Sequence, residues 1–217
     1  MKNIATNTVT ARAKAVFLST SLAAACLSGC ALPLPDKPQR PQPYDLGPPP
    51  AAASASAPAS ASALAMDSVQ AAAALDGTAI IYRLLYSEDG MQPRPYAHAR
   101  WSMSPPQLLT QRLREALAAT RPVVEPGAGL APLELRAELD EFAHVFTSPD
   151  ASEGVIRLRV TVFATAAKGQ RLLSQRSFAV RKPASTHDAP GGVAALRAAA
   201  DDALAQVVQW LSTLPSP

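Results

Sequence analysis

Cys30, close to the N-terminus, is the residue whose surroundings most clearly indicate chemistry in this chain. It follows an apolar run that ends at Cys26 and is preceded by three basic residues and no acidic one. A basic segment followed by a short apolar segment is the layout of a secretory signal. The run is too short to cross a bilayer as a helix, which requires roughly 20 apolar residues. The sequence therefore predicts that residues 1–29 are an export signal.

The segment Leu27-Ser28-Gly29-Cys30 resembles the bacterial lipobox, in which a branched residue and two small residues precede an invariant cysteine. Small residues suit these positions because a peptidase in the membrane must admit an extended backbone beside the thiol. The resemblance implies cleavage between Gly29 and Cys30. It also implies lipid attachment to the Cys30 thiol, with palmitate as the expected acyl chain. Such chains anchor a protein through buried methylenes, at about 0.8 kcal/mol each.

The residue after the cysteine indicates where the anchor is delivered. Residue 31 is Ala and not Asp. In lipoproteins of the enterobacterial type, which this segment resembles, that choice favours the outer membrane over the inner one. We therefore expect an outer-membrane protein that is lipid-anchored and faces the periplasm. The alternative is an ordinary signal peptide followed by an unrelated cysteine.

Residue types typical of hydrolases and metal sites also occur, but their spacing does not favour either. Ser185, His187 and Asp188 have the types of a catalytic triad, yet they lie too close together in one loop to converge. The three histidines, His98, His144 and His187, are far apart and lack the spacing of metal ligands. We expect neither a triad nor a metal site.

An acidic cluster is the last chemical candidate. Glu138, Asp140 and Glu141 could form an acid pair, but Glu138 and Asp140 alternate with apolar residues, as on the solvated face of a strand. Phosphate-loop, dinucleotide, Gly-x-Ser-x-Gly and His-Glu-x-x-His patterns are missing from the sequence. The sequence therefore holds none of these signatures of catalysis, and we expect no cofactor.

Composition limits the class further. The chain holds 20 basic and 17 acidic residues, and removal of the signal with its three bases leaves 17 of each. A nucleic-acid-binding protein normally keeps a basic face, so nucleic acid is not an expected partner. Cys26 lies in the signal and Cys30 would carry lipid, so the exported domain has no disulfide. Residues 66–214 are long enough for one domain with its own core.

Between the cysteine and this domain, residues 30–65 are rich in Pro, Ala and Ser. Such a segment buries too little apolar area to offset its ordering entropy, so we predict a tether that holds the domain several nanometres from the membrane. Tyr44-Asp45-Leu46-Gly47 interrupts this composition. We interpret it as a short edge strand or a docking patch, and the alternative is a stray tyrosine in the tether.

In the first half of the domain, alternation predicts strands at 78–86 and 96–101, and the Asp76-Gly77 turn makes 66–73 the expected partner of the first. Ala71 to Ala74 could instead extend as a helix. Ser104 as N-cap and Pro105-Pro106 in the first turn predict a helix to about Ala119. Its leucine stripe should be buried, while Arg112, Arg114 and Glu115 should face away.

In the second half, we predict strands over 133–146, 156–162 and 172–181 and a final helix from about Gly192 to Pro215. Apolar residues occupy odd positions up to Leu139 and even positions at Phe142 and Phe146. A β-bulge near Asp140 and Glu141 would keep both sets on one face. The expected fold class is α+β, a single mostly antiparallel sheet of about five to six strands with two helices packed on one face.

Several of these pieces together resemble the ABC-type transport auxiliary lipoprotein component family. The matching positions are Tyr44 and Leu46, Ile80 to Tyr82, Tyr96-Ala97, Arg100-Trp101, and Pro106 followed by the helix to Leu117. The downstream layout of strands and a helix agrees as well. The sequence departs from the family pattern in its Pro/Ala/Ser insertion at 48–63, which leaves open whether Tyr44 to Leu46 still joins the sheet.

The resemblance implies a non-catalytic accessory lipoprotein of an intermembrane lipid-transport system. Its expected partners are an MCE-domain periplasmic protein and an inner-membrane ABC transporter. Tyr82, Tyr96, Arg100 and Trp101 form the candidate partner interface. The alternative is a structural or assembly lipoprotein that binds another envelope machine. The sequence does not decide whether the domain forms a homo-oligomer, nor which lipid is carried.

Overall fold

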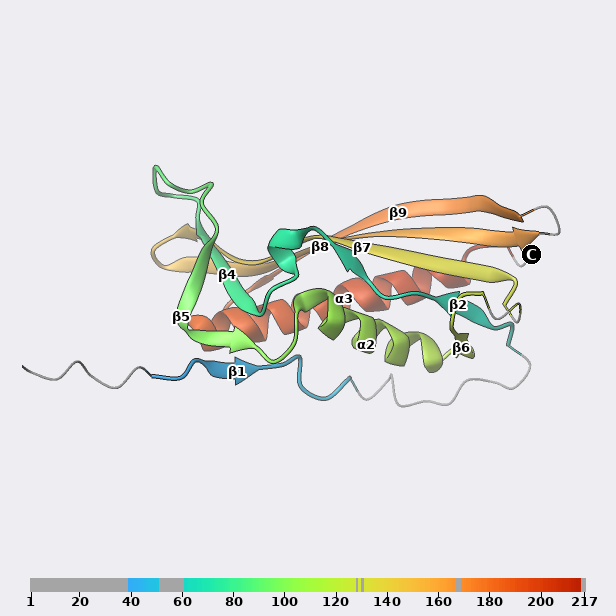
Figure 1. Cartoon of the computed structure of the whole chain (residues 1–217). Helices are drawn as coiled ribbons and strands as arrows, with labels where there is room; N and C mark the ends of the chain where they lie inside the picture. Colours follow the sequence, from blue (N-terminus) through green and yellow to red (C-terminus); the bar gives the residue numbers. More distant parts are fainter. Residues whose placement is uncertain (1–38, 51–60, 128, 130, 167–168, 216–217) are drawn as a thin grey trace, which may run out of the picture. The chain divides into compact units, whose positions relative to one another are not determined.

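The computed structural model describes residues 39–50, 61–127, 129, 131–166 and 169–215. All of them except Gln39 fall in a compact unit that spans Arg40–Pro217 (Figure 1). The strands are β1 (Gln42–Tyr44), β2 (Leu64–Met66), β3 (Gln70–Ala71), β4 (Ala79–Leu84), β5 (Arg94–Trp101), β6 (Val123–Val124), β7 (Leu133–Ser148), β8 (Ala151–Ala166) and β9 (Gly169–Pro183). The helices are α2 (Pro105–Ala118) and α3 (Ala189–Ser212), with a short 3-10 helix at Ala73–Leu75.

The α+β class is confirmed, but the expected sheet of five to six mostly antiparallel strands is not. The described strands form one nine-stranded mixed sheet, in which β7 pairs with β2, β3, β4 and β8. Five of the eight strand pairings are parallel. The extra strands are only two or three residues long, too short for alternation of side chains to reveal them.

Strands β7, β8 and β9 form the long antiparallel part of the sheet (Figure 1). The predicted bulge is confirmed, because Leu139 pairs with Leu158 and Glu141 pairs with Arg157, which leaves Asp140 unmatched. The bulge reverses the parity of β7, so the Phe142 ring is buried. One strand can therefore keep both of its apolar halves in the core.

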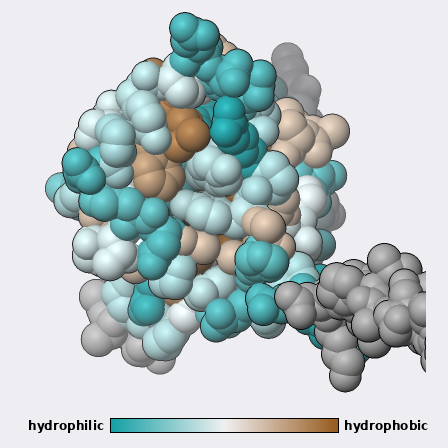
Figure 2. All heavy atoms as spheres, turned by 90° about the vertical axis from the view of Figure 1, so that its left-hand side faces the viewer, coloured by the Kyte–Doolittle hydropathy of each residue, from teal (hydrophilic) through white to brown (hydrophobic). Residues whose placement is uncertain are grey.

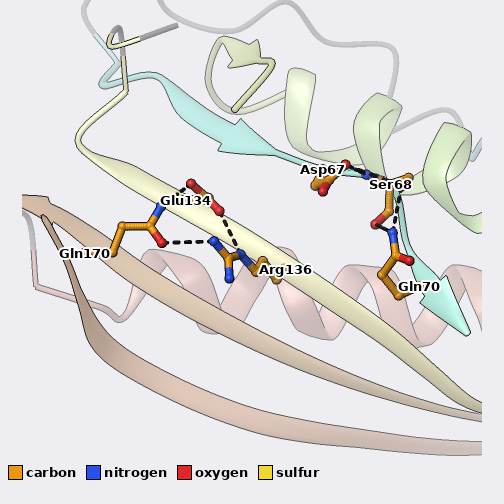
Figure 3. Close-up of polar contacts among 6 residues, drawn as sticks. All are labelled: Asp67, Ser68, Gln70, Glu134, Arg136 and Gln170. Carbon is orange, nitrogen blue, oxygen red and sulfur yellow. Dashed lines mark hydrogen bonds and ion pairs between the residues drawn. The ribbon is translucent and has the colours of Figure 1, made fainter. Parts of the chain in front are cut away.

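The predicted partner of the first strand is wrong. Segment 66–73 does not pair with β4, because β2 and β3 both run parallel to β7. A polar turn separates β2 from β3, in which the Ser68 amide donates to Asp67 Oδ1 at 2.6 Å and Gln70 Nε2 donates to Ser68 Oγ at 2.9 Å (Figure 3). Strand β2 also begins at Leu64, inside the segment that we assigned to the tether.

A second polar group, also drawn in Figure 3, joins β7 to β9 across β8. Arg136 donates through Nε to Glu134 Oε1 at 2.8 Å and through Nη2 to Gln170 Oε1 at 2.9 Å. Gln170 in turn donates to the Glu134 carboxylate. The buried Glu134 is therefore satisfied by both neighbours, and this end of the three strands is held in register.

Helix α2 starts as predicted. Ser104 and Gln107 form a capping box, with prolines in the first turn. The side chains of Leu109, Leu113 and Leu117 are fully buried. The exposed position that we predicted for Arg112 is wrong, because only 5 % of this residue is accessible.

Helix α3 begins at Ala189, earlier than predicted, and the Asp188 side chain caps it by accepting from the Gly191 amide at 2.9 Å. Both helices lie on the same face of the sheet (Figure 1). A Cβ at Gly154 of β8 would lie 2.4 Å from the Ala195 carbonyl carbon, so α3 packs directly on the strand backbone. In the part of the chain described above, no helix is long and apolar enough to cross a membrane.

Candidate lipidation site and docking surface

The predicted lipidation site, Cys30, and the cleavage position after Gly29 lie outside the described residues. Both stay predictions. The residues that follow are informative, because the structure describes the chain from Gln39 and places Gln42–Tyr44 in the sheet.

Strand β1 confirms the interpretation of the Tyr44 segment as an edge strand. Gln42 to Tyr44 pair in parallel with Ala99 to Trp101, and the Ser102 amide donates to the Tyr44 carbonyl at 2.7 Å. Leu46 is 4 % exposed, and its carbonyl accepts from Arg112. The folded unit thus includes residues 40–50, which the sequence analysis placed in the tether.

The four residues of the candidate partner interface differ in how far they are exposed to solvent. Trp101 is 1 % exposed, and its ring packs against Phe142 with centroids 5.5 Å apart. Its side chain therefore belongs to the core and is not available to a partner. Arg100 is exposed on β5, beside Pro43 of β1, whereas Tyr82 and Tyr96 are half-buried.

The two tyrosines lead to a cluster between β4, β5 and β7. Their ring centroids are 4.7 Å apart, and the Tyr96 hydroxyl lies 2.8 Å from His144 Nδ1. Tyr82 also meets the edge of Phe146 at 6.1 Å. Because Tyr82 is the register partner of His144 in the parallel β4–β7 pair, the strand pairing itself brings these rings together.

Burial controls the protonation of this cluster. His144 is fully buried, and desolvation lowers its pKa to about 4, with a smaller contribution from His187. Desolvation also raises the pKa of Tyr96 well above its ordinary value. Both side chains are therefore neutral at physiological pH. A Cβ at Gly192 would lie 2.3 Å from His144 Nδ1, so the first turn of α3 closes tightly over the imidazole.

The serine and histidine of the rejected triad do not meet. His187 Nδ1 instead lies 2.9 Å from Ser152 Oγ of β8. Asp188 accepts from Thr186 Oγ1 at 2.7 Å and from the Gly191 amide, and both hydrogen bonds lower its pKa. Its carboxylate caps α3. Among the described residues, no group of three His, Cys, Asp or Glu side chains is placed to hold a metal ion.

His144 and Arg112 are two of the buried polar residues whose burial we did not predict from the sequence. His144 could have been found, because the predicted bulge assigns even positions of β7 to the core face and so buries residue 144 between Phe142 and Phe146. Arg112 gave no such signal. Its burial depends on Asp201 of α3 and on the Leu46 carbonyl, which only the tertiary structure brings to α2.

The accessible atoms of Tyr82 and Tyr96 are here called the tyrosine surface. Arg100 lies between the buried Ala99 and Trp101 on β5, so its side chain points away from the core. Tyrosine offers a large apolar ring with a polar tip, and arginine offers a planar charge. Both residue types are enriched where proteins bind one another. The rings are fixed from behind by His144 and Phe146, so the surface is preorganised for docking.

The fold is shared with solved structures of low sequence identity. Protein XCC0632 from Xanthomonas campestris is 18% identical, with a TM-score of 0.59, over 72% of this chain and 90% of that one. An uncharacterised protein is 16% identical, with a TM-score of 0.57, over 80% and 99% of the two chains. The hypothetical protein CT253 from Chlamydia trachomatis is 9% identical, with a TM-score of 0.50, over 70% and 96%. A comparison with curated proteins gave no match.

A family model gives the assignment. The model of the ABC-type transport auxiliary lipoprotein component matches residues 44–208, from the end of β1 to the last turns of α3. This range contains Tyr82, Tyr96, Arg100 and the buried His144. The family is one of transport auxiliary lipoproteins and not of enzymes. The chain therefore belongs to the ABC-type transport auxiliary lipoprotein component family.

Proposed function

We propose that this protein is the outer-membrane accessory lipoprotein of an ABC/MCE-type intermembrane lipid-transport system. It would be anchored by lipid on Cys30, face the periplasm and act by docking to an MCE-domain protein. The observation that carries the proposal is the family match over residues 44–208, downstream of a segment that resembles a lipobox. The transporter itself would lie in the inner membrane, so this protein would contribute binding and no chemistry.

The tyrosine surface, together with Arg100, is the proposed docking site. Tyr82 and Tyr96 support each other at 4.7 Å, and Arg100 lies exposed on the same strand as Tyr96. A partner that covers these residues would bury aromatic area and gain a charged contact. Few residues dominate most protein interfaces, and aromatic and arginine residues are over-represented among them.

Affinity capture of the full-length lipoprotein from detergent-solubilised envelope, read by mass spectrometry, tests the proposal. We expect an MCE-domain protein in the eluate and a loss of at least tenfold with Tyr82→Ala/Arg100→Glu. Arg171→Glu is the matched control, because Arg171 is exposed on β9, away from β4 and β5. Recovery of an assembly or secretion component in place of the MCE-domain protein would contradict the proposal and favour the alternative function.

The anchor is tested separately by Cys30→Ala. Without the thiol, lipid cannot be attached, and the cleaved mature protein should no longer be found in the outer-membrane fraction. Mass spectrometry of the native protein should show an acylated N-terminal cysteine. An unmodified Cys30 in an outer-membrane fraction would contradict the anchoring part of the proposal.

A further inference from the structure

The loop between β4 and β5, residues 85–93, exposes apolar side chains that the fold does not use. Leu85 and Tyr86 are each 47% exposed and Met91 is 82% exposed. These are three of the five large hydrophobic side chains that stand exposed in the described part of the chain. Isolated exposed apolar residues are common, but a group of them in one loop marks a contact surface.

The loop presents these side chains in a fixed arrangement. Backbone hydrogen bonds run from Ser87 to Leu84 at 3.0 Å, from Gly90 to Ser87 at 3.0 Å and from Gln92 to Asp89 at 2.9 Å. Arg83 Nη1 also donates to the Met91 carbonyl at 2.8 Å. Successive closed turns hold the loop, so its apolar tips do not fold back onto the domain.

The two acidic residues of the loop, Glu88 and Asp89, are balanced by Arg83 of β4 and Arg94 of β5. Asp89 pairs with Arg94 at 3.5 Å, and Glu88 and Arg83 add one charge of each sign. An anionic partner is therefore neither strongly attracted nor repelled. Tyrosine with leucine or methionine at a loop tip, beside balanced charges, suits the interface of a zwitterionic bilayer, where amphipathic rings lie at the headgroup level.

The direction of β1 indicates which bilayer is in reach. β1 runs parallel to β5, with Gln42 beside Ala99, so Arg40 and Pro41 enter β1 from the side on which β5 starts. Loop 85–93 lies at that same end of the sheet, on the left in Figure 1. Figure 2 views this end directly and shows a mainly hydrophilic surface with a few apolar side chains in its upper half.

The length of the preceding chain limits the distance to the anchor. Because β1 belongs to the fold, only the eleven residues from Ala31 to Pro41 separate Cys30 from the sheet. They reach at most about 40 Å. The far end of the sheet, at the β8–β9 hairpin, is farther away by the length of β7, about 50 Å for its 16 residues.

We infer that loop 85–93 is a membrane-contact element, which rests its apolar tips on the bilayer that holds the Cys30 anchor. The inference rests on the anchoring part of the proposed function and does not involve the partner protein. It orients the domain with the β4–β5 end at the membrane and the β8–β9 hairpin directed away from it. A lipid chain with a second contact gives firmer attachment than one signal alone.

Tryptophan reporters in the native lipoprotein, reconstituted in nanodiscs with brominated phosphatidylcholine, test this inference. Both natural tryptophans, Trp101 and Trp210, are buried, and their emission in the unsubstituted protein gives the background. We expect the added emission of Tyr86→Trp to fall at least twofold relative to non-brominated nanodiscs. The added emission of Leu172→Trp, 56% exposed near the start of β9, should not change.

Met91→Trp is a second reporter on the same loop, where 82% exposure leaves room for the larger ring. No quenching of either loop reporter, or equal quenching of Leu172→Trp, overturns the inference. Shielding of the loop only after an MCE-domain protein is added also overturns it, because the loop would then bind protein. Failure of the unsubstituted protein to enter nanodiscs would instead contradict the anchor, which distinguishes the two ideas.

Discussion

Arg112 of α2 and Asp201 of α3 form an ion pair between the two helices, with Nε and Oδ1 3.2 Å apart. The pair lacks a well-directed hydrogen bond, and burial raises the pKa of Asp201 despite the attraction of Arg112. The same guanidinium donates to the Leu46 carbonyl. One buried side chain thus joins both helices to the segment that follows β1.

Removal of Arg112 should therefore be costly. Arg112→Ala leaves a half-buried carboxylate and a buried carbonyl without their partner, and we expect a loss of about 3 kcal/mol in the free energy of unfolding. Arg114→Ala is the control, because its partner Glu125, 2.8 Å away, is exposed and its bond to the Met66 carbonyl is long at 3.3 Å, so we expect a loss below about 1 kcal/mol. Urea denaturation measures both. Equal losses would contradict the structural role of Arg112.

Substitution of Gly154 should separate α3 from the sheet. A methyl group there would lie 2.4 Å from backbone atoms of Ala195 and Leu196, which cannot rotate away. We expect Gly154→Ala to destabilise the domain by about 2 kcal/mol or more. A Cβ added at Gly77 would have no neighbouring atom within 4 Å, so Gly77→Ala should be neutral or slightly stabilising. Thermal melts of both variants measure the difference.

His144 should make stability depend on pH. Its pKa falls from 6.5 in the unfolded chain to about 4 in the fold, so the unfolded state binds more protons between these values. The contribution is complete above pH 6.5 and is lost as the pH falls towards 4. When the pH falls from 7 to 4.5, the free energy of unfolding should decrease by about 2 kcal/mol more in the natural protein than in His144→Gln. Parallel pH profiles of the two proteins would contradict this origin.

Trp101 should report on the core and not on docking. Trp101→Ala removes a fully buried ring that packs on Phe142, and we expect a loss of about 3–5 kcal/mol. Arg100→Glu, one residue away and exposed, should leave the melting temperature unchanged while it weakens partner capture. If Trp101→Ala were as stable as the natural protein, the ring would not be part of the core.

The bulge should depend on the extra backbone residue at position 140 and not on the Asp140 side chain. Deletion of Asp140 moves Phe142 and the following even positions to the solvent face, so cooperative unfolding should disappear. Asp140→Ala keeps the bulge and loses only a surface pair with Arg159 at 2.8 Å, which should cost less than about 1 kcal/mol. Circular dichroism melts separate the two results.

The sequence by itself determined the features that depend on local pattern. The capping box at Ser104 lies in adjacent residues, the parity change between Leu139 and Phe142 is visible without a partner strand, and the fold class follows from the long elements. The family likewise rests on short motifs along the chain. Such features need only the neighbours that each residue has in the chain, and the structure and the family match confirmed them.

The tertiary structure decided what depends on residues far apart in the chain. Strands of two or three residues, such as β2 and β6, exist because neighbouring strands complete their hydrogen bonds, so their own composition does not reveal them. Trp101 became core because Phe142 covers it, and Arg112 became buried because Asp201 and Leu46 provide its partners. These residues stabilise the fold through contacts between segments that are far apart in the chain, and a local sequence pattern cannot predict such contacts.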